Sequence, residues 1–576
     1  MTPLLVAQLP DIPAESVSGT AWMTVGILLV GVVTVVGGVL FLRLHAFLAL
    51  LLGALFVALL TPEASVERSF VQEKKVPLLA TENGKWFFLK TRALPGELYL
   101  VLGRNAKSGR LEPIADLRVE RLEERKDGTG KTVMCAVAAV SPGKDFDESR
   151  FFTVIHPRDY SAAVNLSRRS VGARIAEGFG STCAKIAILI AMAAIIGKCL
   201  LDSGAADRIV RSTLRLFGEK GAPLSFLSSG FLLAIPVFFD TVFYLMIPLG
   251  KAMRLRTGKN YLLYVLAIVA GGSMAHSLVP PTPGPLFVAE QLGVDLGTMI
   301  LAGCAVGFFT SGAGFAWALF ANRKWDLPLR DSPEMTLSDL ESLSRKDDAD
   351  LPPLWLSLLP ILLPVAFIGG FTILKRFSDS VPGSVMGVAA TLGDKNIALV
   401  IAAAIAMATL VVQKRTSRKE LANAIQASLA SGGVIILITA GGGAFGGILR
   451  QTGVADLIQD LPQSSSWAIL SLAFLITAAI RTAQGSSTVA MITAVGILSG
   501  VATSDTLGFH PVYLALAIGC GSKPIGWMND SGFWVIGKLS GMTEGETLKT
   551  ITPLSAIMGF VGLIVILIGV TIFPGA

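Results

Sequence analysis

The sequence predicts an all-α polytopic membrane protein with two inverted repeats, re-entrant hairpins and broken helices, and a small β-rich extracytoplasmic insert. Three observations lead to this fold class. The 576-residue chain is 52% hydrophobic and only 15% charged, with a mean hydropathy of +0.65, a balance typical of multi-span membrane proteins. Two apolar segments are interrupted by polar residues, and one sequence pattern occurs twice. One stretch near the N-terminus is instead dense in charged and β-forming residues.

Composition also indicates what the chain does not do. The formal net charge is +7, but Lys and Arg collect in short segments beside apolar runs, as cytoplasmic loops do, so we expect no nucleic-acid partner. The five cysteines show no paired spacing, and four lie in apolar segments, where cysteine packs as a small hydrophobe. The four histidines are isolated, so we expect no metal site and no cofactor. No nucleophile stands beside a matching base, so we expect no enzyme.

A helix needs about 20 apolar residues to cross a bilayer, and we expect ten crossing segments. They lie near Ala21–Leu42, His45–Leu60, Thr182–Leu201, Asn260–Leu278, Thr298–Ala321, Leu354–Leu374, Asn396–Val412, Gly432–Leu449, Tyr513–Ile518 with its continuation, and Thr552–Phe573. The first is expected to be a retained span, because no basic residue precedes it as in a cleaved signal peptide. The predicted organisation is two spans at 1–61, the insert at 62–169, the rest of the first repeat at 170–321, a cytoplasmic linker at 322–353 and the second repeat at 354–576.

Two further apolar regions, Ala222–Gly250 and Ser466–Val501, are interrupted near their middles. Each half has about 14 residues, which is too short to span. We therefore expect two re-entrant hairpins whose tips lie inside the protein. Two ordinary helices joined by a polar turn outside the membrane are the alternative.

The repeat is visible where Ile196–Val210 matches Phe445–Gln459 at a constant offset of 249 (453 − 204). In each copy a span is followed by an amphipathic segment, an interrupted hairpin, a broken span and a final span. The Lys and Arg residues that flank the spans and the first hairpin fall in the cytoplasm if the N-terminus lies outside, the first hairpin enters from inside and the second from outside. Lys375 and Arg376 would then lie outside and break this rule. The two repeats are then inverted.

The stretch from Pro62 to Arg169 holds 34 of the chain's 89 Asp, Glu, Lys and Arg residues. Short alternating runs with a Gly-rich turn between two of them predict β-strands. The runs are Lys85–Lys90, Glu97–Leu102, Leu117–Leu122, Thr132–Val137 and Phe151–Ile155, and the turn is Asp127–Gly130. This insert contains no motif that carries chemistry.

Asp240 is the most informative single residue of the chain. It lies in an apolar segment between Pro236 and Pro248, each of which removes a helix hydrogen bond. A carboxylate at membrane depth is costly and marks a pathway for an ion or a solute. We predict that Asp240 couples an ion and that Thr241 contacts a substrate, at a break between short helices.

A second cluster runs from Gly271 to Pro285. Because proline has no N–H, the run through Pro280, Pro281, Pro283 and Gly284 leaves carbonyls and helix ends free to meet a solute. We predict these residues as broken-helix backbone. His276 is a candidate for ion coupling, and a packed, hydrogen-bonded core histidine is the alternative.

A third cluster, Arg481 to Thr488, combines hydroxyls with the start of a half-helix. Gly485, Ser486, Ser487 and Thr488 are predicted to form a cradle for an anion. Arg481 is predicted to bind a substrate carboxylate directly. The alternatives are that it pairs with a protein acid or extends its head towards the membrane surface.

The fourth cluster lies between Gly519 and Trp534. Gly521 and Ser522 are predicted as broken-helix backbone, Asn529 as a substrate contact and Asp530 as an ion-coupling acid. The alternative for Asp530 is a structural one, in which it caps the helix that follows.

Taken in order, these motifs resemble the gluconate permease (GntP-type) family of bacterial sugar-acid:proton symporters. The motifs are Ile235–Pro248, His276–Pro285, Gly485–Ala490 and Asn529–Trp534. The resemblance covers the chain outside Pro62–Arg169. It implies membership of the ion-transporter superfamily, with two inverted repeats, a scaffold and a mobile transport domain, and a homodimer.

The sequence departs from the family pattern at several positions near the motifs. The family usually has His where Thr282 and Trp527 stand, and Pro where Ser531 stands. It has Val-Gly at Thr241-Val242, and no lysine at Lys523. Two proton-carrying candidates are thus replaced and one cation is added.

Together these features predict a secondary active transporter in the bacterial cytoplasmic membrane, with its N-terminus and insert outside the cell. It would import a small hydroxylated monocarboxylate, such as a gluconate-like sugar acid, with protons. Protons offset the cost of moving an anion into a negative interior, about 2.3 kcal/mol per charge per 100 mV. A sodium-coupled carrier is one alternative. A receptor that senses a ligand through the insert is another.

Overall fold

The computed structural model describes residues 14–76, 78–82, 85–88, 94–105, 110–126, 132–140, 151–330, 351–453, 466–502, 507–528 and 530–575. The chain divides into two compact units. The sheet unit comprises Met1–Thr34, Leu52–Glu177 and Gly447–Leu461. The helical unit comprises Val35–Leu51, Gly178–Gly446 and Pro462–Ala576.

The multi-span character predicted from hydropathy is confirmed. Among the described residues, nine helices are long and apolar enough to cross a membrane, or ten if α2 (Ala46–Leu60) and α3 (Glu63–Lys74), bent by 103°, count as one span. Besides α2, α3 and the α4 helix (Pro157–Arg168), the described helices outside the two repeated sets are α1 (Ala14–Leu40), α6 (Ala205–Phe217), α13 (Leu354–Lys375), α14 (Gly383–Leu392) and α15 (Lys395–Lys414).

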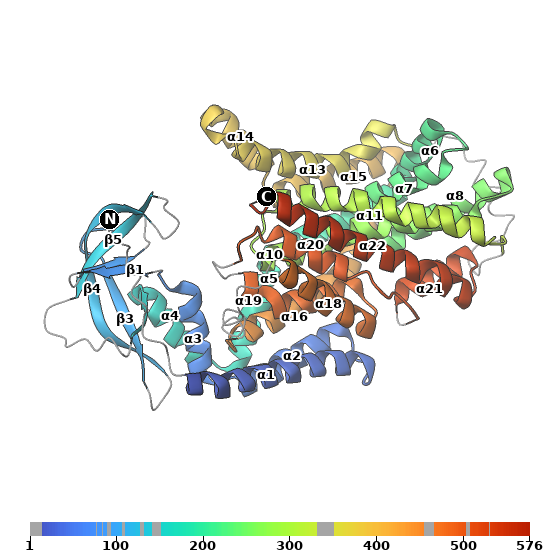
Figure 1. Cartoon of the computed structure of the whole chain (residues 1–576). Coiled ribbons are helices and arrows are strands. Elements are labelled where there is room, and N and C mark those ends of the chain that lie inside the picture. The colour runs from blue at the N-terminus through green and yellow to red at the C-terminus, as the bar shows by residue number, and fades with distance from the viewer. Residues whose placement is uncertain are drawn as a thin grey trace. The chain divides into compact units, whose positions relative to one another are not determined.

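Two sets of helices, most of them labelled in Figure 1, follow each other along the chain with the same order of elements. The first set is α5 (Val171–Asp202), α7 (Ala222–Leu233), α8 (Phe239–Thr257), α9 (Tyr261–Leu278), α10 (Pro283–Gln291) and α11 (Leu296–Lys324). The second set is α16 (Arg418–Arg450), α18 (Ser466–Gln484), α19 (Ser487–Ala502), α20 (Val512–Gly521), α21 (Ser531–Ser540) and α22 (Glu544–Ile572). Gly204 and Gly453, which end the first helix of each set, both have φ +81°, a conformation that favours glycine.

Both interrupted regions fold as two helices separated by a short break, with α7 and α8 in the first set and α18 and α19 in the second. The lengths differ from those expected. α18 has 19 residues and is by itself long and apolar enough to cross a membrane, so the estimate of about 14 residues per half was wrong for it. α8 also has 19 residues, because it continues past Pro248 to Thr257.

The two helices that lead into the broken spans, α9 and α20, occupy the centre of the helical unit. Nearly all residues of α9 and every residue of α20 are buried. Small residues allow the close approach of α7 to α9. A Cβ on Gly271 would lie 2.1 Å from the carbonyl oxygen of Leu227 and 2.9 Å from the backbone nitrogen of Phe231.

We therefore expect Gly271→Ala to destabilise the chain. The methyl group would meet backbone atoms that cannot move without separating α7 from α9, and such overpacking costs about 1–3 kcal/mol. Thermal unfolding of the purified protein in detergent measures the effect. Gly312→Ala is the matched control, since a Cβ at Gly312 in α11 meets nothing within 4 Å; equal midpoints for the two variants would contradict the packing argument.

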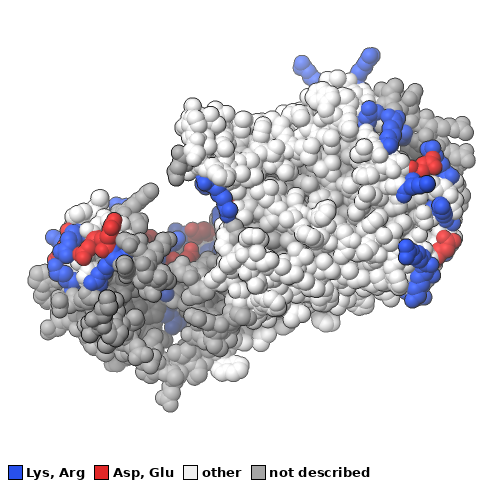
Figure 2. Space-filling model, turned by 45° about the horizontal axis from the view of Figure 1, so that its top comes forward, with Lys and Arg blue, Asp and Glu red and all other residues white. Residues whose placement is uncertain are grey.

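Charge is distributed unevenly over the helical unit. On the face that Figure 2 shows, Lys and Arg side chains gather at the end where Figure 1 places α6 and α21. The surfaces between the two ends are almost free of charge. This is the distribution expected of a body that lies across a bilayer.

The insert contains one antiparallel six-stranded sheet in the order β1-β2-β5-β4-β3-β6. The strands are β1 (Leu78–Glu82), β2 (Lys85–Phe88), β3 (Leu98–Arg104), β4 (Leu111–Lys126), β5 (Thr132–Val140) and β6 (Phe151–Ile155). The five predicted strands are confirmed. β1 was missed, because Leu-Leu-Ala-Thr-Glu does not alternate between apolar and polar residues. The predicted turn Asp127–Gly130 lies outside the described residues.

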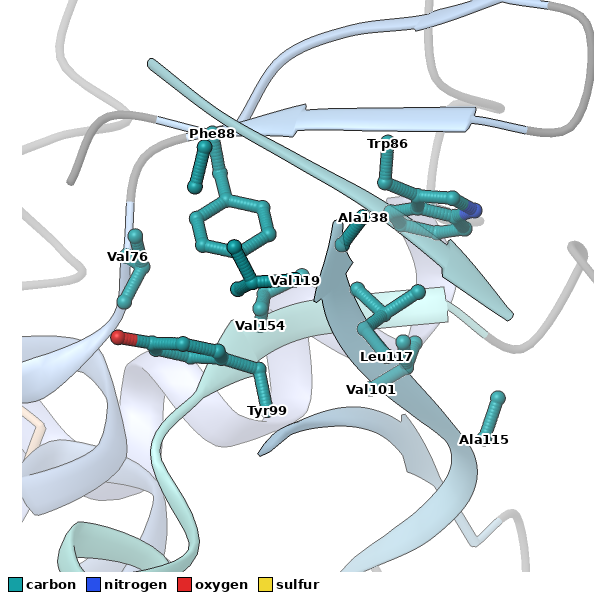
Figure 3. Close-up of a cluster of buried hydrophobic side chains, with 11 residues drawn as sticks. Val76, Trp86, Phe88, Tyr99, Val101, Ala115, Leu117, Val119, Ala138 and Val154 are labelled. Atoms are coloured by element: carbon teal, nitrogen blue, oxygen red, sulfur yellow. The ribbon is translucent and has the colours of Figure 1, made fainter. Parts of the chain in front are cut away.

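The sheet has a core of its own, drawn in Figure 3. Side chains two residues apart point to one face of a strand, so Trp86 and Phe88 of β2 enter this core, and Phe88 lies 4.9 Å from the Tyr99 ring. Phe87 points to the other face, where it packs with Cys135 and Val137. Val71 of α3 and Ala163 of α4 (Pro157–Arg168) contribute to a further cluster with Leu102, Leu111 and Ile155. Two faces covered in this way make a stable small domain.

Candidate functional site

A cavity of about 420 Å³ lies inside the helical unit, where the breaks of both repeated sets meet. The predicted site residues that line it are Asp240, Thr241, His276, Arg481, Ser486, Ser487, Thr488 and Asp530. They come from four separate parts of the sequence, which the fold brings to one place. The sequence clusters therefore form a single site.

Three helices begin at this cavity, and each presents backbone N–H groups at its first turn. Phe239 opens α8, Ser487 opens α19 and Ser531 opens α21, and all three residues line the cavity. A helix N-terminus carries a partial positive charge and unsatisfied N–H donors. Three of them around one cavity make it suited to a small anion.

Arg481 and Asp530 form an ion pair at the cavity wall. The Arg481 side chain is only 4% exposed; its Nη2 pairs with Oδ2 of Asp530, and its Nε donates to the carbonyl oxygen of Ser522 at 3.1 Å. Asp530 also accepts a hydrogen bond from the N–H of Gly532 at 2.9 Å and so caps α21. The sequence left open whether Arg481 meets a protein acid and whether Asp530 is a cap, and the structure shows both interactions.

One donor of Arg481 is still available. Its Nη1 is buried and has no partner among the described residues, although a buried guanidinium donor is normally hydrogen-bonded. Arg481 lines the cavity. A solute that entered could therefore accept a hydrogen bond from Nη1 without disturbing the ion pair with Asp530.

Asp240 stands in the first turn of α8 and is reached by solvent from the cavity. It forms no salt bridge with a described residue, in contrast to Asp530. Asp240 and Asp530 line the same cavity. An unpaired acid that solvent can reach at this depth is free to accept and release a proton.

His276 lies near the C-terminal end of α9, with its ring edge-on to Phe238 at 6.3 Å between centroids. Its Nδ1 is buried and has no hydrogen-bond partner among the described residues. The alternative for His276 was a core histidine that is both packed and hydrogen-bonded, and the structure agrees with only the first part. The ring is packed, but one nitrogen is unsatisfied beside the cavity.

The hydroxyl cluster forms the start of α19. Gly485, with φ +77°, makes the break that ends α18, and the Ser486 hydroxyl accepts from the N–H of Val489 at 3.3 Å. The Ser487 hydroxyl donates to the Ser522 carbonyl at 3.1 Å. The same carbonyl thus receives Arg481 and Ser487, which joins the break of α18–α19 to that of α20–α21.

The predicted broken-helix residues do not line the cavity but shape the breaks around it. Pro280 and Pro281 lie with other prolines in a separate apolar pocket. A Cβ on Gly284 would lie 2.0 Å from Met491 Cε, and one on Gly521 would lie 2.5 Å from the Phe474 carbonyl oxygen. The remaining predicted residues are Pro283, which is buried at the start of α10, and Ser522, whose hydroxyl donates to Gly519 at 2.7 Å. Asn529 lies outside the described residues.

The cavity also contains residues that the sequence reasoning did not select. They are Phe238, Phe239, Ser273, Ser431, Lys523 and Ser555, among others. Lys523 had a signal, because it is the only charge in the apolar run from Pro511 to Met528. The serines had none, because a helix in a membrane protein carries serines on many faces.

No group of three or more His, Cys, Asp or Glu side chains that could hold a metal ion occurs in the described part of the chain. What the cavity offers is instead two acids, two cations, hydroxyls and helix N-termini. This set can bind a small polar anion and carry a proton. It contains no arrangement for bond-breaking chemistry.

Comparison with known proteins agrees with this chemistry. The model of the GntP family of permeases matches residues 160–572. A gluconate permease of Pseudomonas aeruginosa is 33% identical over 398 residues, which cover 68% of this chain and 86% of the relative. The low-affinity gluconate transporter of Escherichia coli K12 is 32% identical over 397 residues, covering 69% and 87%, and the inner membrane permease YgbN of the same strain is 29% identical, covering 70% and 89%.

The fold is also similar to that of a solved membrane protein, the YdaH transporter of Alcanivorax borkumensis. The TM-score is 0.51 at 14% sequence identity, with 71% of this chain and 90% of that chain covered. The family match over residues 160–572 begins in α4, after the last strand of the insert. It spans both repeated sets of helices and all the cavity residues. The chain is a multi-span transporter that belongs to the GntP family of permeases.

Proposed function

We propose that this transporter imports a small hydroxylated monocarboxylate, such as a gluconate-like sugar acid, together with protons. The observation that carries the proposal is the placement of Asp240, accessible and unpaired, in one cavity with the hydroxyls and N-terminus of α19. The helix N-termini favour an anion. The hydroxyls of Ser486, Ser487 and Thr488 suit a polyhydroxylated solute. Relatives at about one-third identity are named gluconate permeases.

The proposed roles combine the lining of the cavity with the residues that the sequence predicts. Arg481, through its free Nη1, and Thr241, Gly485, Ser486, Ser487, Thr488 and Asn529 contact the substrate. Asp240 carries the coupling proton, with His276 and Asp530 as the further candidates for ion coupling in the cavity. The proline and glycine breaks hold these elements in place.

Uptake into proteoliposomes tests the proposal. A panel of sugar acids, with sugar alcohols and dicarboxylates as controls, is offered under a pH gradient and then under a sodium gradient at fixed pH. We expect sugar acids to accumulate only under the pH gradient. Accumulation driven by sodium alone would favour the alternative carrier, in which Asp240, Asp530 and freed carbonyls bind Na⁺. If no sugar acid enters under either gradient, the proposal is wrong.

We further propose that the two repeats are inverted in the cytoplasmic membrane of a bacterium, with the N-terminus and the insert outside. The repeated element order supports two related halves. α5 has 32 residues and is about 48 Å long, enough to cross a bilayer. It leads into α6, which lies at the basic end of the helical unit (Figures 1 and 2). The start of α5, which follows the insert, then belongs to the opposite side.

Cysteine labelling is expected to reveal this orientation. Arg118→Cys, at an exposed position of β4, should react with an impermeant maleimide added to intact cells. Lys414→Cys, at the exposed end of α15, should react only after the membrane is opened. The unmodified chain, whose cysteines are buried or partly buried, is the control. The reverse pattern would overturn the orientation.

Assembly as a homodimer, which the family resemblance implies, is part of the same proposal. Native mass spectrometry of the purified chain in a mild detergent would test it. A mass of one chain under conditions that preserve binding would contradict it.

A further inference from the structure

Lys523 is a buried cation that the proposed mechanism has not used. It lies in the break between α20 and α21, next to Ser522, and is 6% exposed. Its side chain lines the cavity. It forms no ion pair with an acid of the described residues, although a buried ammonium group is expensive unless it is paired.

The charges around the cavity can be counted. The charged lining residues among those described are Asp240, Arg481, Lys523 and Asp530, with His276 as a further titratable group. Arg481 and Asp530 neutralise each other in their ion pair. Lys523 and Asp240 are left, each without an ion-pair partner, in the wall of one cavity of about 420 Å³. A cavity of this volume has room for a small solute.

We propose that Lys523 binds the carboxylate of the substrate while Asp240 receives the coupling proton, so that the loaded site has the same net charge as the empty one. This inference rests on the proposed import of a monocarboxylate. Arg481 is held by Asp530, so its free Nη1 meets a substrate hydroxyl and Lys523 takes the charge.

The charge balance has a consequence for coupling. With Asp240 ionised, the empty site carries two positive and two negative charges and is neutral. The anion alone makes it negative and the proton alone makes it positive, whereas both together restore neutrality. Because moving a net charge through a low-dielectric layer is costly, the empty and the fully loaded forms reorient most easily. One proton then accompanies each monocarboxylate, and transport moves no net charge.

The role of Lys523 is tested by binding, using gluconate and its uncharged amide, gluconamide, with purified protein in detergent. A charge-assisted hydrogen bond contributes about 1.5–3 kcal/mol, so wild type should prefer the acid to the amide by more than tenfold. Lys523→Gln should lose this preference, and Lys523→Arg should keep most of it. Lys538→Gln, near the exposed end of α21, which follows the break that holds Lys523, lies outside the cavity and should behave as wild type.

Charge movement tests the balance in the unmodified chain. In proteoliposomes with a fixed pH gradient, we expect gluconate accumulation to be the same at zero and at −100 mV. A cycle that moved one net charge would change the accumulation ratio about 40-fold at this potential. This measurement uses the unmodified chain, so it tests the inference even if Lys523→Gln does not fold.

The outcomes separate the inference from the proposed function. Lys523→Gln that keeps the preference for the acid, or accumulation that depends on potential, overturns the inference while sugar-acid uptake stands. Absence of both gluconate binding and uptake in wild type overturns the proposed function, and the inference falls with it.

Discussion

Asp240→Asn is expected to abolish accumulation of substrate while exchange of internal for external substrate continues. An amide keeps the size and the hydrogen bonding of the side chain but cannot release a proton. The variant therefore resembles the permanently protonated carrier, which moves when loaded and cannot return empty. Uptake of labelled gluconate into proteoliposomes measures both activities, with accumulation under a pH gradient and exchange with equal substrate on both sides.

Asp326→Asn is a suitable control for Asp240→Asn. Asp326 is an acid whose side chain is 78% exposed, and it does not line the cavity. It should accumulate substrate as wild type does. Full accumulation by Asp240→Asn would remove Asp240 from the coupling role and leave Asp530 or His276 as the proton carrier.

Arg481→Gln is expected to destabilise the chain, because it removes the buried member of an ion pair and leaves the Asp530 carboxylate, whose side chain is only 20% exposed, without its partner. Removing one member of a buried ion pair costs about 3–5 kcal/mol. The double variant Arg481→Gln with Asp530→Asn has no unpaired charge and should recover most of this loss. Thermal unfolding in detergent measures all three chains. If the double variant unfolds at the same temperature as Arg481→Gln alone, the unpaired Asp530 carboxylate is not the cause of the destabilisation. The Arg481–Asp530 ion pair would then not be what joins the α18–α19 break to the α20–α21 break.

The pair between Arg330 and Glu546 is the comparison. Both side chains are about one-third exposed, and a solvent-exposed ion pair contributes only about 0–1 kcal/mol. Arg330→Gln should therefore shift the midpoint much less than Arg481→Gln does.

The folded double variant also separates binding from stability. If Nη1 of Arg481 contacts the substrate, the KM of the double variant for gluconate should rise by more than tenfold, a loss of about 1.4 kcal/mol. An unchanged KM would make Arg481 a structural residue. The hydroxyls of Ser486, Ser487 and Thr488 would then be the main contacts besides Lys523.

The sequence was sufficient to find the site clusters because their chemistry is rare in its surroundings. A carboxylate or a guanidinium within an apolar run is conspicuous, and so is a run of prolines, since each conflicts with an ordinary spanning helix. Because such clusters could be recognised, eight of the residues predicted from the sequence are among those that line the cavity. The serines at positions 273, 431 and 555 do not stand out from the helices that contain them, so the sequence pattern did not indicate them.

Helix lengths were predicted less well, because hydropathy does not show where a helix ends. α18 continues to Gln484 and so includes the buried Arg481. The sequence pattern places Arg481 in the polar break after the helix. Arg481 stays helical because Asp530 and the carbonyl of Ser522, far away in sequence, satisfy its charge. No local pattern contains that information.

By itself, the sequence determined that this protein spans a membrane many times and contains a sheet in its insert, and it carries a pattern that occurs twice. These properties depend on composition, periodicity and a repeated order of residues, which are local. Only the tertiary structure decided which charges are paired and which are free. Arg481 and Lys523 are both cations in apolar surroundings, yet Arg481 forms an ion pair with Asp530, whereas Lys523 forms none with a residue that the structure describes. The difference comes from how α18, α20 and α21 pack, because the energy of a buried charge depends on its neighbours in space.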